Sequence, residues 1–103
     1  MSYLVELSIF PLDKGESVGK YVARVVDLID KSGLDYRVGP MGTCFEGEWD
    51  EVFHLIRECF DNLKTDCQRV TASLKIDWRS ESEGRLKSKI GSLEKYLGRT
   101  LKH

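Results

Sequence analysis

The chain has little cysteine and no spacing that would give its cysteines a structural use. The three, Cys44, Cys59 and Cys67, are odd in number and include no Cys-x-x-Cys pair. This argues against a disulfide framework and a zinc site, and it is typical of proteins from a reducing cytoplasm. Long apolar runs are missing, and the first residues, Met-Ser-Tyr-Leu-Val-Glu, lack the regions of a signal peptide. We therefore expect a cytoplasmic protein without a membrane anchor, a metal or a cofactor.

An excess of basic charge is also missing. Sixteen Lys and Arg side chains face seventeen Asp and Glu, which leaves a net charge of −1. Without a basic excess, electrostatic binding to nucleic acid or to an anionic membrane is not expected. Hydrophobic residues at 41% and charged residues at 32% are ordinary values for a soluble globular protein. The length predicts one domain, spanning residues 1–103.

Hydrophobic periodicity predicts seven elements of secondary structure. Alternation of apolar and polar residues predicts strands near residues 5–9, 36–38, 43–46 and 70–77. Apolar residues at helical spacing predict helices near residues 18–32, 49–63 and 86–97. Ser17 is expected to cap the first helix, and Gly33 and Gly98 to close the first and the last. Residues 77–84 read as a polar linker.

The order of these elements, βαββαβ with an added C-terminal helix, predicts an α+β fold of the ferredoxin-like type. In this topology the antiparallel sheet has strand order 4-1-3-2, so the first and third strands are central. The two main helices should then cover one face of the sheet, against the apolar residues of the central strands and of the fourth strand.

The other face of the sheet follows from alternation along each strand. We expect it to carry Leu4, Glu6, Ser8, Phe10, Arg37, Cys44, Glu46, Thr71, Ser73, Lys75 and Asp77. Two carboxylates, Glu6 and Glu46, would thus lie on adjacent central strands. A carboxylate on a central strand is unusual enough to need a reason.

Two interpretations of this polar face remain open. It can be a solvated sheet face, on which Glu6 and Glu46 pair with Lys75 and Arg37 across strands. It can instead be a recognition surface, on which carboxylates and hydroxyl groups hold a polar or cationic ligand. Ser8 or Thr43 would then supply the hydroxyl group.

Segments along nearly the whole chain resemble, in consistent order, the small thiamine-binding protein family, which is related to proteins that bind the hydroxymethylpyrimidine part of thiamine. The matching segments are Ser8-Ile9-x-Pro11-Leu12, Ser17-Val18-x-x-Tyr21-Val22-Ala23, Ser32-Gly33-Leu34-x-Tyr36, Pro40-Met41-Gly42-Thr43, Glu46-Gly47-Glu48, Asp50-Glu51-Val52, Arg69-Val70, Lys75-Ile76-Asp77 and Arg79. The chain departs from the family pattern at Phe60, Cys67 and Trp78, where the family often has His, Gly and a second acid.

The resemblance implies a homo-oligomer, a dimer of dimers (homotetramer) joined through sheets and edge strands. It also implies a non-enzymatic pocket for thiamine or its hydroxymethylpyrimidine moiety near subunit contacts. We expect Glu6, Ser8, Met41, Thr43 and Glu46 to line this ligand site, with no catalytic and no metal-binding residue. The thiazolium cation of thiamine would favour nearby carboxylates and aromatic faces.

Two competing functions follow from the same residues. The chain can be a structural or regulatory homo-oligomeric module whose polar face makes only subunit contacts. An enzyme is a poorer hypothesis: acylphosphatase shares this size and topology, but its chemistry needs an arginine in the loop after the first strand, and residues 11–17 offer only Lys14. His54, a lone histidine on a predicted helix, is expected to be structural or exposed.

Overall fold

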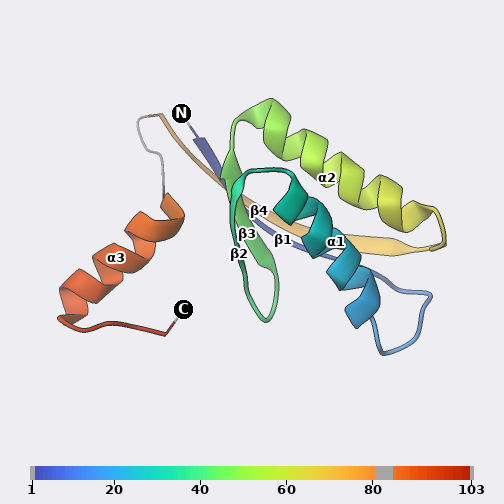
Figure 1. Ribbon diagram of the computed structural model, residues 1–103, viewed down its shortest axis with the longest axis horizontal. Helices are drawn as coiled ribbons and strands as arrows, with labels where there is room; N and C mark the ends of the chain where they lie inside the picture. Colours follow the sequence, from blue (N-terminus) through green and yellow to red (C-terminus); the bar gives the residue numbers. More distant parts are fainter. Residues whose placement is uncertain (1, 81–84, 103) are drawn as a thin grey trace.

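The strands and helices follow the predicted order. They are β1 (Ser2–Pro11), α1 (Gly19–Lys31), β2 (Asp35–Val38), β3 (Thr43–Gly47), α2 (Trp49–Lys64), β4 (Val70–Arg79) and α3 (Arg85–Leu97). In the computed structural model, which describes residues 2–80 and 85–102, the sheet order is β2-β3-β1-β4 and every pair is antiparallel. This is the predicted order 4-1-3-2 read from the other edge, so the ferredoxin-like α+β fold is confirmed (Figure 1).

The core lies between the sheet and the pair α1 and α2. Alternate residues of β1 point toward these helices, and Phe45 does so from the centre of β3. The buried apolar side chains are Val5, Leu7, Ile9, Tyr21, Val25, Ile29, Phe45, Val52, Leu55, Cys59, Leu63 and Cys67. Tyr36 packs against this core and its hydroxyl group donates to Asp30 at 2.6 Å, so the phenol is satisfied at the edge.

The helix ends agree with the sequence at all but one position. The predicted cap at Ser17 is wrong, because the carbonyl of Val18 accepts the first helical N–H groups and α1 begins at Gly19. The predicted glycines are confirmed: Gly33 and Gly98, just past α1 and α3, have φ values of +80° and +69°. The predicted polar linker begins later than expected, since β4 continues to Arg79, and residues 81–84 of that linker lie outside the described residues.

The helix layer covers only the start of β4, where Val70 packs against the core, contrary to the expectation that it would cover all the apolar residues of that strand. Leu74 and Ile76 are opposite Leu7 and Val5, on the helix side of the sheet, yet they are 40% and 39% exposed. Two helices about 10 Å apart cover little more than the central strands of such a sheet. The edge strand β4 therefore presents an apolar stripe to solvent.

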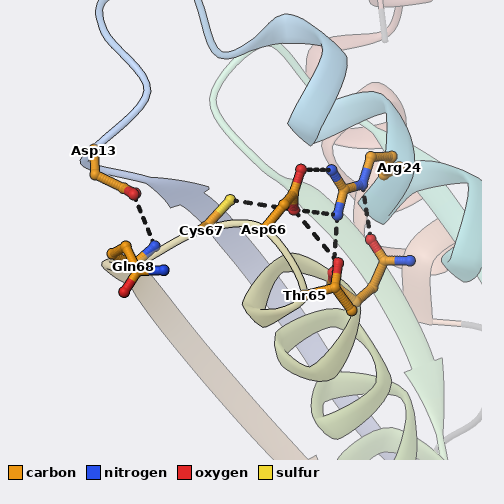
Figure 2. Close-up of polar contacts among 7 residues, drawn as sticks. Asp13, Arg24, Thr65, Asp66, Cys67 and Gln68 are labelled. Carbon is orange, nitrogen blue, oxygen red and sulfur yellow. Dashed lines mark hydrogen bonds and ion pairs between the residues drawn. The ribbon is translucent and has the colours of Figure 1, made fainter.

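An arginine joins α1 to the turn after α2. Arg24 donates from Nη1 and Nη2 to the two carboxylate oxygens of Asp66, both at 3.0 Å, and from Nε to Oδ1 of Asn62 at 2.9 Å. Two parallel bonds from one guanidinium to one carboxylate fix the geometry better than a single contact does. Figure 2 shows this clamp between the helices.

A second carboxylate fixes the loop after β1 to the start of β4. Asp13 accepts the backbone N–H group of Gln68 at 2.7 Å (Figure 2) and that of Arg69 at 3.2 Å. The backbone N–H of Leu12 in turn donates to the carbonyl of Arg69 at 2.8 Å. Together these bonds fix the end of the β1–β4 strand pair at which Pro11 lies opposite Val70.

Acidification is expected to weaken these contacts. The Arg24 guanidinium lowers the pKa of Asp66, and the N–H of Gln68 lowers the pKa of Asp13. The unfolded-state pKa is about 3.9, so the stabilisation is fully present above that pH and is lost as the pH falls through the lower folded values. We expect the urea concentration at the unfolding midpoint of the wild-type protein to decrease when the pH is lowered below about 4. In Asp66→Asn this midpoint should depend less on pH than in the wild type. Asp61→Asn, an exposed acid on α2, is the control; an equal effect there would contradict the assignment.

Candidate functional site

The polar face of the sheet carries the two predicted carboxylates. Glu6 of β1 lies between Cys44 of β3 and Lys75 of β4, and Ser8 lies opposite Ser73. Glu46 lies one row further along, opposite Leu4. Glu6 and Glu46 are therefore on the same face and on adjacent strands, as the alternation predicts.

A shallow cavity of about 320 Å³ lies on this face. We name it the sheet-face cavity; it is lined by Glu6, Ser8, Met41, Ser73, Leu74 and Lys75. Its polar groups are one carboxylate, two hydroxyl groups and one ammonium group, and the thioether of Met41 adds a polarizable wall. Three of the five predicted ligand-binding residues meet here.

Glu46 is not part of the sheet-face cavity lining. Its side chain is buried, 8% exposed for the residue, and its Oε2 accepts a hydrogen bond from the hydroxyl group of Ser2 at 2.9 Å. Arg37, the partner suggested for Glu46, lies opposite Cys44, while Asp35 lies opposite Glu46. The hydrogen bond from Ser2 thus compensates part of the cost of burying this carboxylate. The sequence gave no reason to single out Ser2.

Thr43 lies on the opposite side of the sheet from Glu6. It pairs with Leu7, is buried, and lines a second cavity of about 240 Å³ between α1 and the turn that joins β2 to β3. We name this second space the hairpin cleft. Val22 and Val26 of α1 give it an apolar wall. Of the five predicted site residues, Glu6 thus lines only the sheet-face cavity, Thr43 lines only the hairpin cleft, and Glu46 lines neither.

Ser8 and Met41 border both cavities. The position of Met41 comes from a tight turn in which the N–H of Gly39 donates to the carbonyl of Gly42 at 2.8 Å. A Cβ atom at Gly42 would lie 3.1 Å from the carbonyl oxygen of Leu7, so glycine lets this turn approach β1 closely. The turn places an exposed methionine beside Ser8.

Ser73 and Lys75 complete the sheet-face cavity although they were not predicted as ligand residues. Alternation along β4 had placed both on the polar face. The register agrees with the cross-strand pairing of Glu6 and Lys75 suggested from the sequence, and it also puts Ser73 opposite Ser8. Both residues could therefore have been included in the predicted ligand site.

The other candidate sites in the part of the chain that the structure describes are a histidine and a metal-binding cluster. His54 on α2 lies 2.6 Å from Glu58, measured from Nε2 to Oε1, in a surface pair one helical turn apart, as expected for a structural or exposed histidine. Within residues 2–80 and 85–102 there is no group of three or more His, Cys, Asp or Glu side chains suited to a metal ion. No helix in the same part of the chain is long and apolar enough to cross a bilayer.

A four-stranded antiparallel sheet with two helices on one face and a polar cavity on the other defines a ferredoxin-like α+β domain with a candidate small-molecule site. A family model described as "Thiamine-binding protein" matches residues 5–94. The chain belongs to this thiamine-binding protein family.

Relatives and solved structures agree with this assignment. The UPF0045 protein MJ1052 of Methanocaldococcus jannaschii is 37% identical over 90 residues, which are 87% of this chain and 90% of that protein. The UPF0045 protein sll0230 of Synechocystis is 33% identical over 98 residues, 94% of this chain and 81% of that protein. The crystal structure of MJ1052 superposes with a TM-score of 0.83, covering 89% of this chain and 95% of that one.

A more distant structure shows the same fold. It belongs to TM0486 of Thermotoga maritima, a candidate thiamine biosynthesis/salvage protein by its description. The TM-score is 0.80 at 22% identity, over 90% of this chain and 99% of that one.

Proposed function

We propose that this protein is a non-enzymatic binder of thiamine or its hydroxymethylpyrimidine moiety that acts in the cytoplasm as a homo-oligomer. The observation that carries the proposal is the sheet-face cavity, where Glu6, Ser8 and Met41 meet. Family membership supports the choice of ligand. Of the other two predicted residues, Glu46 can extend the proposed site from the next row of the same face, whereas Thr43 faces the hairpin cleft on the other side of the sheet.

The donors and acceptors of the cavity suit an aminopyrimidine. The exocyclic amine of the pyrimidine can donate to the Glu6 carboxylate, and its ring nitrogens can accept from the hydroxyl groups of Ser8 and Ser73. The positive thiazolium ring of thiamine is favoured beside a carboxylate, whereas Lys75 opposes it at the other wall. The free pyrimidine therefore tests how much the thiazolium ring contributes.

The sheet-face cavity is open to solvent on one side, which supports a binding site that a second copy of the chain closes. Its volume of about 320 Å³ is at the lower end of the roughly 300–1,000 Å³ usual for ligand sites, which bury most of their ligand. A second copy of the sheet facing the first would close it. β4 is a ten-residue strand at the edge of the sheet, a type of edge that readily pairs with another chain. We propose a dimer of dimers assembled through these surfaces.

Glu6→Gln is expected to weaken thiamine binding about 10- to 100-fold. A hydrogen bond to a charged group is worth roughly 1.5–3 kcal/mol, and each 1.4 kcal/mol is about tenfold in affinity. Isothermal titration of the pure protein with thiamine and with hydroxymethylpyrimidine measures the effect, with Glu16→Gln in the exposed loop as the matched control. No heat from the folded wild-type protein at high micromolar ligand would contradict the proposal.

The exposed stripe on β4 favours a second candidate, a structural or regulatory oligomer without a dedicated ligand. Under that function Glu6→Ala would change the oligomer mass while wild type and variant both fail to bind thiamine. Size-exclusion chromatography with light scattering on Glu6→Ala and Glu46→Ala, combined with the titration, distinguishes the two functions.

A further inference from the structure

Helix α3 has an apolar side that residues 2–80 and 85–102 of its own chain leave largely exposed. It lies beside β2 and β3, on the other side of the sheet from α1 and α2 (Figure 1). Leu93 and Leu97 are 55% and 53% exposed, and Tyr96 is more exposed still. A helix of 13 residues is marginal in water unless an apolar face packs against something. α3 therefore needs a surface beyond those it contacts here.

A matching apolar surface lies on the opposite side of the sheet. We name it the β4–α2 patch: the side chains of Leu74, Ile76 and Trp78 on the helix side of β4, with Trp49 at the start of α2. All four are exposed by at least a third. The ring of Tyr3 joins them, since its centroid is 5.3 Å from that of Trp49 and 6.4 Å from that of Trp78. Contiguous exposed patches of this kind mark interaction sites.

Charge distinguishes the two surfaces and makes them complementary. Residues 85–103 hold six of the sixteen Lys and Arg but only one of the seventeen Asp and Glu, so the rest of the chain is acidic. Three of those acids, Glu48, Asp50 and Glu51, are exposed at the start of α2, next to Trp49 in the β4–α2 patch. A basic amphipathic helix fits an apolar patch bordered by acids.

We propose that α3 of one copy packs its apolar side, Ile90, Leu93 and Leu97, on the β4–α2 patch of a second copy. The helix and the patch lie on opposite sides of the sheet within one chain, so a second copy supplies what each lacks. Each chain carries one helix and one patch, which allows a reciprocal exchange about a two-fold axis. The contact goes beyond the proposed function, because it involves no ligand and its β4–α2 patch lies on the opposite face of the sheet from the sheet-face cavity.

Disulfide trapping between two different variants tests the exchange directly. Leu97→Cys in one preparation and Ile76→Cys in another, both with Cys44→Ser to remove the exposed thiol of the polar face, are mixed under mild oxidation. We expect a covalent heterodimer in the mixture. Lys20→Cys, exposed on α1, replaces Ile76→Cys in the control and should give at least tenfold less heterodimer. Equal yields, or no heterodimer, would overturn the proposal.

A chain carrying both Leu97→Cys and Ile76→Cys separates exchange from folding back within one chain. Covalent dimers support the exchange, and a covalently closed monomer overturns it. Leu93→Ser with Leu97→Ser should reduce the oligomer mass in light scattering while the urea midpoint of the main transition stays near wild type; an unchanged mass overturns the proposal.

Anionic vesicles test the competing partner for a basic amphipathic helix. Sedimentation of wild-type protein with phosphatidylserine vesicles, lost in the Leu93→Ser, Leu97→Ser variant and without heterodimer trapping, would assign α3 to a membrane surface instead. Because thiamine titration is measured separately, failure of the exchange leaves the ligand proposal standing, and failure of ligand binding leaves the exchange standing.

Discussion

Phe45→Ala is expected to lower the free energy of unfolding by about 3–5 kcal/mol, the cost usual for removing a buried phenylalanine ring. Phe45 is fully buried at the centre of β3, where it pairs with Val5 on one side and Tyr36 on the other. The ring belongs to the buried core cluster between the sheet and the two helices, and β-sheet hydrogen bonds limit how far the backbone can close the cavity. Urea unfolding monitored by circular dichroism measures the change.

Phe45→Leu is the matched control, because it keeps an apolar side chain of intermediate volume at the same site. Its cost should be less than half that of Phe45→Ala. If Phe45→Ala cost under about 1 kcal/mol, the ring could not be the centre of the core, and the helix layer would have to pack elsewhere.

Cys59 is expected to react about 100-fold more slowly than a thiol of ordinary pKa, and Cys67 is also expected to be slow. Burial raises the pKa of Cys59 to about 11, two units above its ordinary value in solution, and burial also raises the pKa of Cys67. Two units reduce the thiolate fraction about 100-fold, and enclosure in the core slows reagent access further. Cys44, on the polar face beside Glu6, is the accessible thiol. Thiol titration at pH 8 should show one rapid group per chain.

Cys44→Ser should remove the rapid phase and leave the slow groups unchanged. Three equal rates in the folded wild type would contradict the buried positions of Cys59 and Cys67. The same titration serves the ligand proposal, since the Sγ of Cys44 lies 3.9 Å from Oε2 of Glu6. Saturating thiamine in the sheet-face cavity should slow the rapid phase, while Glu6→Gln should remove that protection.

Much of the fold could be predicted because the information is local. Strict alternation in β1 and β4 reports which residues face the core, and the order of elements restricts a chain of this length to few topologies. The same alternation correctly placed Glu6 and Glu46 on one face. Alternation also predicts the side of Thr43. Thr43 is two residues before Phe45 on β3, so both side chains lie on the helix side of the sheet.

The rest depended on contacts between distant residues. The burial of Glu46 involves Ser2, 44 residues away, and the composition of the sheet-face cavity depends on the register of β4 against β1. The exposure of Leu74 depends on how far two helices extend across a sheet, which no periodicity reports. The Ser17 prediction failed by one residue, since Val18 occupies the N-cap and no side-chain hydrogen bond caps α1.

Ser8 and Met41 belong to the walls of two spaces that lie on opposite sides of one sheet. A molecule bound on the polar side that turns the Met41 side chain also reshapes the apolar space beneath α1. Linkage makes such an effect reciprocal: whatever occupies the apolar space changes affinity on the polar side by the same factor. If binding on one side is coupled to binding on the other in this domain of 103 residues, the turn that carries Met41 is where we expect the coupling to arise.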